Sequence, residues 1–187
     1  VYLHGGGYSQ GYGHLNCYDG EGFAKRGIVT VTLNHRLGIF GYLGHPELTA
    51  EDEHHISGNY GVLDIIEALK WVKRNIEAFG GDPEKITVFG QSGGGDKTTT
   101  MLVTPLTDGI VKGAIMQSGG GLNMVFGEKS LADSEEAGKK LIEGMGYANI
   151  AEARKASSEE LLQRVREYAG PAPMATMHLF SPCADGY

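Results

Sequence analysis

Two patterns of apolar residues alternate along this chain. In one, apolar residues recur every three or four positions, and in the other they form short continuous runs. Over residues 59–79 they fall three and four positions apart, which is the pattern of a helix that buries one face. That stripe comprises Val62, Ile65, Ile66, Leu69, Val72, Ile76 and Phe79. A second amphipathic helix is predicted over residues 130–145, with an inner side made of Leu131, Ala137, Leu141 and Ile142. Ser157 and Glu160 form a capping box, which predicts a third helix ending near residue 169.

Short runs of apolar, often β-branched residues separate the helices and predict strands. These runs occupy residues 1–3, 28–33, 86–89 and 113–117, and the strands at 1–3 and 28–33 are expected to be buried. A short helix is expected over residues 19–26, with Phe23 and Ala24 facing inward and Gly27 as its stop. Strands that alternate with helices indicate an α/β fold with a mostly parallel, doubly wound sheet.

Three segments fit these patterns less well. Residues 34–57 lack a clear period, and long loops inside compact domains are commonly functional, so part of a pocket wall is expected there. Residues 171–187 are also irregular. A helix is predicted over residues 96–103, although Asp96, Lys97 and three threonines give it poor propensity. Burial must therefore stabilise that helix.

Composition and charge narrow the classes of function. The chain has 187 residues, the length of one domain, and its 30 glycines cluster at predicted turns. A formal net charge of −7, without a cluster of lysine or arginine, argues against a nucleic-acid partner. No apolar run is long enough for a membrane span. Two cysteines, Cys17 and Cys183, do not make a disulfide framework; we expect free, buried thiols and leave their redox state open.

The two ends of the sequence fall in unusual places. It begins at Val1 inside a predicted strand, without methionine, and stops at Tyr187 with no closing element. We therefore expect residues 1–187 to be an incomplete domain, the central part of a larger sheet flanked by helices. Its sheet edges would be unpaired, so the isolated chain should be poorly soluble or molten. Localisation, any signal peptide and the oligomeric state stay undetermined.

The segment with the most specific chemistry is Gly90-Gln91-Ser92-Gly93-Gly94. It lies between a predicted strand and a predicted helix, and G-x-S-x-G in that position is the nucleophile elbow of α/β-hydrolases. Glycines are needed there because a β-carbon would strike the adjoining strand and helix. A second segment, His4-Gly5-Gly6-Gly7, follows the first strand at once, and such a segment leaves backbone N–H groups free for an oxyanion hole.

The order of further motifs closely resembles the type B carboxylesterase and cholinesterase-like family. The resemblance covers essentially the whole chain and rests on His4-Gly5-Gly6-Gly7, Asn34-His35-Arg36-Leu37-Gly38, Gly58-Asn59-Tyr60-Gly61-Val62-Leu63-Asp64, Ala68-Leu69-Lys70-Trp71-Val72, Asn75-Ile76, Phe79-Gly80-Gly81-Asp82-Pro83, Ile86-Thr87-Val88-Phe89-Gly90-Gln91-Ser92 and Gln117-Ser118-Gly119. It implies an α/β-hydrolase that cleaves small carboxylic esters through an acyl-enzyme, without a cofactor or metal. Ser92 would be the nucleophile, and the N–H groups of Gly6, Gly7 and Gly93 would form the oxyanion hole.

Two positions depart from the family pattern. Gln91 stands where glutamate is usual, which favours uncharged esters over a cationic, choline-like substrate. Gly93 stands where alanine is usual, and glycine still offers its N–H. Together with Gly94, Gly95 and Lys97, these departures resemble bacterial members of the family. The acyl and alcohol preferences stay undetermined.

The partners that would activate the serine are not evident. In this fold the acid and the histidine follow the nucleophile in that order. His178 is the one histidine after Ser92, with only Asp185 beyond it, so we expect both partners to be absent from this chain and His178 to be a loop residue. The resemblance places Ser118 beside the catalytic histidine, although a buried structural serine is an equal interpretation. His4 is expected to orient its own loop, and His54-His55 to lie in a solvated loop rather than a metal site.

Two other interpretations compete with the esterase. One is a cholinesterase-like binding or adhesion protein with a dead site; such proteins commonly lose the nucleophile or the oxyanion glycines, whereas Ser92, Gly6 and Gly7 all stand here. The other is a hydrolase of the hormone-sensitive-lipase type. The long stretch over residues 34–57 and the F-G-G-D-P segment argue against that type.

Overall fold

A computed structural model of the chain describes residues 1–120, 129–172 and 175–187. The chain divides into two compact units. The first contains the described residues within Val1–His35 and Val62–Val125, and the second those within Arg36–Gly61 and Phe126–Tyr187. Each unit has its own packed interior, and each is treated below by itself.

The first unit is built on a parallel sheet of three described strands. They are β1 (Tyr2–Leu3), β2 (Thr87–Gln91) and β3 (Gly113–Gln117), in the spatial order β1-β2-β3. Tyr2 pairs with Phe89 and Gln91 pairs with Gln117, so the carboxyl ends of all three strands meet at one edge. The predicted parallel α/β arrangement is confirmed, and the segments after the strands come together at that edge.

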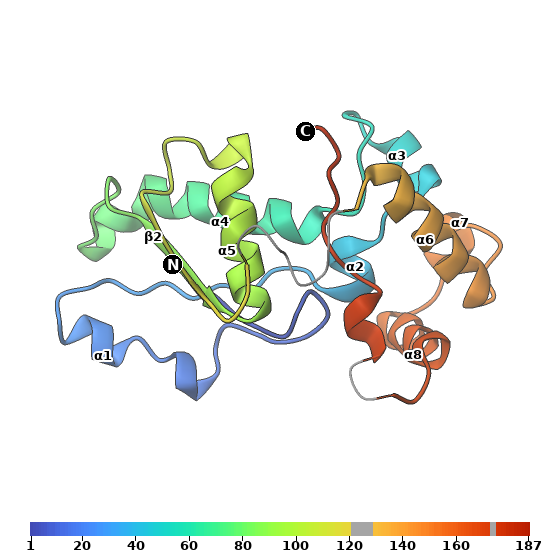
Figure 1. The fold of residues 1–187 in the computed structure, drawn as a ribbon, viewed down its shortest axis with the longest axis horizontal. Helices are drawn as coiled ribbons and strands as arrows, with labels where there is room; N and C mark the ends of the chain where they lie inside the picture. Colours follow the sequence, from blue (N-terminus) through green and yellow to red (C-terminus); the bar gives the residue numbers. More distant parts are fainter. Residues whose placement is uncertain (121–128, 173–174) are drawn as a thin grey trace. The chain divides into compact units, whose positions relative to one another are not determined.

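Helix α5 (Gly93–Val103) starts directly after β2 and packs against all three strands (Figure 1). It begins three residues earlier than the sequence pattern predicts. Asp96, Lys97 and Thr98 are fully buried, so tertiary burial does override their poor helix propensity. Thr104 and Pro105 end the helix, and a 3-10 turn, η3 (Pro105–Thr107), follows.

The amphipathic helix of residues 59–79 is observed as α4 (Tyr60–Asn75) followed by a 3-10 turn, η2 (Ile76–Phe79). Its stripe is buried from Val62 through Ile76. The prediction is wrong for Phe79, which is 64% exposed and lies against Trp71. The last turn tightens to three residues per turn, which rotates Phe79 off the buried face.

Two further predictions for the first unit need correction. Residues 28–33 form one isolated parallel bridge, Tyr2 to Thr32, and Ile28 and Val29 are exposed. The other correction concerns α1 (Glu21–Ala24), which is shorter than predicted and leaves Phe23 43% exposed, although Gly27 does adopt the left-handed conformation that ends it. Burial was predicted in both places, but in the described chain Ile28 and Val29 stay exposed, and Phe23 is covered only in part, by an edge-on contact with the Phe89 ring at 5.7 Å. A short 3-10 turn, η1 (Asn16–Tyr18), precedes α1.

The second unit is helical. It contains α2 (Gly38–Tyr42), α3 (Pro46–Glu51), α6 (Leu131–Gly144), α7 (Ile150–Ala153), α8 (Ser158–Ala169) and a 3-10 turn, η4 (Ala175–His178) (Figure 1). Helices α2 and α3 lie where the sequence predicted only an irregular stretch, and α7 was also missed. Leu141 and Ile142 are buried as predicted, Leu131 is half-buried and Ala137 is exposed, and Val165 of α8 is also buried.

Polar contacts join distant segments of the second unit. The Arg154 guanidinium donates to both carboxylate oxygens of Glu51, at 2.8 and 2.7 Å. Buried Asn59 donates to the Cys183 carbonyl at 2.8 Å and accepts from the Cys183 N–H at 3.0 Å. Both cysteines are free; Cys183 is buried as expected, but Cys17 is exposed, so that part of the expectation is wrong. No helix in the described ranges is long and apolar enough to cross a bilayer.

Candidate active site

Ser92 lies between β2 and α5 in a backbone conformation that non-glycine residues rarely adopt. Its φ is +56° and its ψ is −128°, a strained combination that costs about 1–3 kcal/mol and persists only where the surroundings enforce it. The Ser92 N–H donates to the Gln117 carbonyl at 2.8 Å, and the Ser92 carbonyl accepts from the Gly95 N–H at 2.7 Å. Ser92 holds the N-cap position of α5, yet its side chain makes no capping hydrogen bond. The hydroxyl is therefore not used to cap the helix.

Close backbone approaches explain the glycines on both sides of Ser92. A β-carbon on Gly90 would lie 2.6 Å from the Leu3 carbonyl oxygen of β1, and one on Gly94 would overlap the same oxygen. No real β-carbon tolerates such a distance from backbone, so the tight turn requires glycine at both positions. The G-x-S-x-G pattern thus has the steric cause that the sequence suggested.

The glycine segment after β1 lies against the elbow. Gly6 and Gly7 have φ values of +92° and +60°, in the left-handed region that favours glycine. An ideal β-carbon on Gly5 would be 3.5 Å from the Ser92 β-carbon, and one on Gly93 would be 2.6 Å from the Gly7 nitrogen. The structure therefore brings the predicted nucleophile and the three predicted oxyanion glycines together. We call residues His4 to Gly7 the oxyanion loop.

His4 is buried inside this loop. Its Nδ1 is 2.8 Å from the Gly5 carbonyl oxygen, which assigns the proton to Nδ1, and its ring stacks on His35 at 4.8 Å. Burial lowers the pKa of His4, with the nearby Lys97 charge acting in the same direction, so the ring is neutral at pH 7. These contacts fit the predicted role of His4 in orienting the loop.

A buried pair of opposite charges, Asp96 and Lys97, lies beneath the elbow on α5. The Lys97 ammonium donates to the carbonyl oxygens of His4 at 3.0 Å and Gly7 at 2.7 Å, and Asp96 accepts a short hydrogen bond from the Gly120 N–H. Burial lowers the pKa of Lys97 to about 7, and the Asp96 charge opposes that shift. Sequence reasoning gave this pair no role. The sequence feature that could have revealed it is the presence of two adjacent, oppositely charged residues in a helix that was already expected to be buried.

Gln91 and Ser118 flank the site at the ends of β2 and β3. The Gln91 side chain is exposed, and its Oε1 would lie 3.7 Å from a β-carbon on Gly5. Ser118 has a φ of +49° and is exposed, so the interpretation of a buried structural serine is wrong. Its predicted place beside a catalytic histidine stays a prediction.

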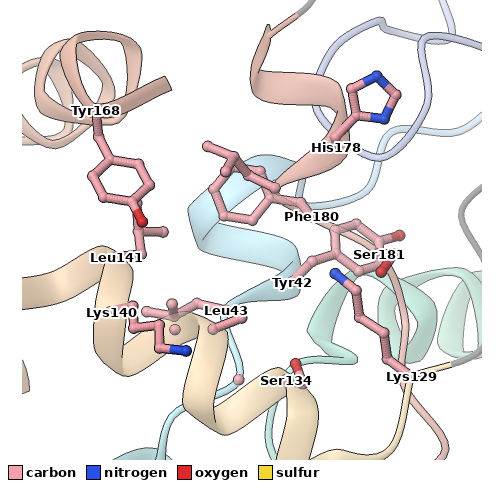
Figure 2. A pocket seen from close by; sticks show the side chains of 14 residues that line it. Tyr42, Leu43, Lys129, Ser134, Lys140, Leu141, Tyr168, His178, Phe180 and Ser181 are labelled. Atoms are coloured by element: carbon pink, nitrogen blue, oxygen red, sulfur yellow. The ribbon is translucent and has the colours of Figure 1, made fainter. Parts of the chain in front are cut away.

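A cavity of about 190 Å³ lies in the second unit, and its lining does not include Ser92. Tyr42 and Leu43 form part of its wall, as expected of the stretch over residues 34–57. His178 also lines it, on η4, but Figure 2 shows its imidazole pointing away from Ser134. No general-base role for His178 is evident in this cavity.

Across the described ranges, no three His, Cys, Asp or Glu side chains gather as metal ligands would. The exposed His54 ring stacks on Tyr187 at 4.4 Å, and its Nε2 lies 3.5 Å from a Glu53 carboxylate oxygen.

Comparison with known proteins identifies the family. The model of the carboxylesterase family matches residues 1–187. This chain belongs to the carboxylesterase family. It is similar to the fumonisin B1 esterase of Sphingopyxis macrogoltabida, at 39% identity over the whole chain and 33% of that relative. It is 40% identical to the para-nitrobenzyl esterase of Bacillus subtilis over 87% of the chain and 32% of that relative.

Solved structures of carboxylesterases agree with this assignment. The Geobacillus stearothermophilus carboxylesterase superposes with a TM-score of 0.80 at 33% identity, covering 99% of this chain and 38% of that one. The fold is therefore the α/β-hydrolase fold, and the resemblance read from the motifs is confirmed. The chain spans about a third of the length of the relatives it matches.

Proposed function

We propose that this chain carries the nucleophile and the oxyanion hole of a serine carboxylesterase that works through an acyl-enzyme. The observation that carries the proposal is the strained backbone of Ser92, held where the oxyanion loop, the elbow and the turn after β3 meet. The Ser92 hydroxyl attacks the ester carbonyl carbon while its proton passes to a histidine base. The resulting oxyanion accepts hydrogen bonds from the N–H groups of Gly6, Gly7 and Gly93, each worth about 10²–10³-fold in rate.

The second half of the cycle follows from the same groups. Collapse of the tetrahedral intermediate breaks the bond to the alcohol, which leaves with the proton returned by the histidine. Water then attacks the acyl carbon on Ser92 and gives a proton to the histidine, and the oxyanion hole binds a second tetrahedral intermediate. Its collapse breaks the bond to Ser92 Oγ, which takes the proton back from the histidine as the acid is released. The reaction needs no cofactor, because backbone N–H donors stabilise the negative charge of the oxyanion and the histidine carries the transferred proton.

The acid and the histidine base of this proposal lie outside residues 1–187. His178 is the one histidine that follows Ser92 in this sequence, and only Asp185 lies beyond it, which is the wrong order for the acid and the histidine of this fold. The matched relatives are about three times as long, which leaves room for both partners. Because loss of the base costs on the order of 10⁶-fold in kcat, residues 1–187 alone should be nearly inactive.

The proposed substrates are small uncharged esters. Gln91, next to the nucleophile, contributes no negative charge that would attract a cationic alcohol group. The relatives named as fumonisin B1 esterase and para-nitrobenzyl esterase are consistent with ester substrates here.

The test uses the full-length protein that contains residues 1–187. A fluorophosphonate should label Ser92, and p-nitrophenyl acetate should be hydrolysed. Both activities should disappear in Ser92→Ala and persist in Ser158→Ala, which changes an exposed serine of α8. Absence of labelling and hydrolysis in the unmodified protein would refute the esterase and favour a binding module. Rapid hydrolysis by residues 1–187 alone, lost in Ser92→Ala, would refute the proposal that the histidine base lies outside these residues.

A further inference from the structure

We propose that Lys97 is a positioning residue that holds the oxyanion loop in place through its two buried hydrogen bonds from α5. The inference rests on the proposed function, since it assigns a task to the loop of that same site. Lys97 is 1% exposed and lies one turn into α5. It acts through the two carbonyl groups to which it donates, those of His4 and Gly7.

Each carbonyl of the oxyanion loop has a defined partner. The His4 and Gly7 carbonyls accept from Lys97 Nζ, and the Gly5 carbonyl accepts from the His4 ring. The Gly6 carbonyl accepts from the N–H groups of Ser9 and Gln10, at 3.4 and 3.2 Å. A trans peptide is planar, so holding a C=O turns the N–H of the next residue to the opposite side. The directions of the Gly6 and Gly7 N–H groups are therefore set by this series of acceptors.

Lys97 holds the first and the last carbonyl of that series. Between them lie Gly6 and Gly7, whose left-handed φ values and missing side chains leave the backbone free to rotate. The Lys97 bonds fix the peptide planes between His4 and Gly5 and between Gly7 and Tyr8. The two planes between these carry the Gly6 and Gly7 N–H groups; their own carbonyls bond to the His4 ring and to the Ser9 and Gln10 N–H groups, and Lys97 holds the two ends from which they are aligned. A buried carbonyl left without a donor is unfavourable, so the loop resists rotation of its peptide planes.

The chemistry of the site explains why a lysine is needed. One atom must donate to two carbonyl oxygens, and an amine does so in either protonation state, with two or three N–H groups. The Lys97 ammonium also lies 5.5 Å from the centre of the Tyr8 ring. Asp96 offsets the charge of Lys97 and accepts from Gly120 on the far side of the elbow. Two adjacent residues of α5 thus fix the loops on both sides of Ser92.

The experiment compares Lys97→Met with Thr98→Val in the full-length protein. Methionine keeps the length and apolar stem of lysine but cannot donate. Thr98 is equally buried on α5, and among the described residues its hydroxyl donates to the Gly94 carbonyl of its own helix. Titration of Ser92 to completion with a fluorophosphonate counts the folded sites. We expect kcat per titrated site to fall about 100-fold in Lys97→Met, with KM changed less than threefold, and to stay within threefold in Thr98→Val.

A trifluoromethyl ketone, which forms a tetrahedral adduct with a nucleophilic serine, provides the second measurement. Its inhibition constant should rise in Lys97→Met by the same factor as kcat/KM falls, because the adduct uses the oxyanion hole. A merely structural role would lower the number of titrated sites and leave both quantities per site unchanged, which would overturn the inference. Failure of the unmodified protein to label or hydrolyse would instead refute the proposed function.

Removing only the lysine leaves the Asp96 carboxylate buried without its counter-charge, which can prevent folding. The same comparison is therefore also made in an Asp96→Asn background, where the asparagine oxygen can still accept from Gly120. Asp96→Asn alone is the reference, and the double variant should again lose about 100-fold in kcat per titrated site. Equal activity of the two would overturn the inference.

Discussion

An ideal β-carbon on Gly93 would lie 2.6 Å from both the nitrogen and the α-carbon of Gly7. The oxyanion loop therefore approaches the start of α5 more closely than any side chain at position 93 would allow. The close approach is possible because position 93 is glycine, which has no β-carbon.

This contact predicts the effect of Gly93→Ala. The added methyl group should push the loop away from Ser92 and lower kcat by about 10- to 100-fold, because small displacements of positioned donors are expensive in rate. It should also destabilise the protein by about 1–3 kcal/mol through overpacking. Ester hydrolysis per titrated site and the thermal midpoint measure the two effects.

Gly22 provides the matched control for that substitution. It is an exposed glycine of α1, and a β-carbon there would meet nothing within 4 Å. Gly22→Ala should leave kcat unchanged. If Gly93→Ala were as active as Gly22→Ala, the close approach of the loop to α5 would be wrong.

The burial of Lys97 predicts a pH dependence of stability. Its pKa is about 7 in the folded state and 10.5 when unperturbed, so between these values the unfolded state binds more protons. The free energy of unfolding should therefore rise with pH across this window, by up to about 1.4 kcal/mol per pH unit, and the gain is lost as pH falls through 7. The titratable neighbours of Lys97 do not explain such a change. His4 is already neutral in this pH window, burial keeps Tyr8 protonated, and Asp96 is the carboxylate beside the Lys97 amine.

Thermal midpoints of the unmodified protein and Lys97→Met between pH 7 and pH 10 isolate this contribution, because other groups cancel in the difference. The unmodified protein should gain stability relative to the variant as pH rises. Parallel curves over this range would show that Lys97 is not buried as described.

A third prediction concerns Asn59 in the second unit. Its side chain makes two hydrogen bonds to the Cys183 backbone and donates to an Asp185 carboxylate oxygen at 2.8 Å. Asn59→Leu should cost about 2–4 kcal/mol, because two buried backbone groups lose their partners. It should also release the segment around Cys183, whose thiol has a pKa raised to about 11 by burial.

Alkylation by iodoacetamide at pH 8, read by peptide mass spectrometry, measures that release. In the unmodified protein exposed Cys17 should react while Cys183 stays protected, and in Asn59→Leu both should react. Asn75→Ala is the control, since the Asn75 side chain donates to the Trp71 carbonyl of its own helix within the part of the chain that the structure describes. Protection of Cys183 in Asn59→Leu would contradict the prediction.

The sequence pattern predicted the parts of the fold whose cause is local or repeated. The stripe from Val62 to Ile76, the strand Gly113–Gln117 and the strand, elbow and helix around Ser92 were all evident. Ile28 and Val29 were wrongly expected to be buried, because β-branched composition cannot tell whether a covering element exists. The task of Lys97 was hidden for a related reason: a lysine in a polar run is typical of a surface, and only the packed structure shows its two acceptors.

The hydrogen bond from Lys97 to His4 joins residues 93 positions apart. Parallel pairing of such distant segments is entropically slow to form during folding. During synthesis, the loop emerges from the ribosome long before the strand and the helix that hold it. The N–H donors of the oxyanion loop can be aligned only after α5 has been synthesised and packed. A partly synthesised chain that lacks α5 therefore has no working oxyanion hole.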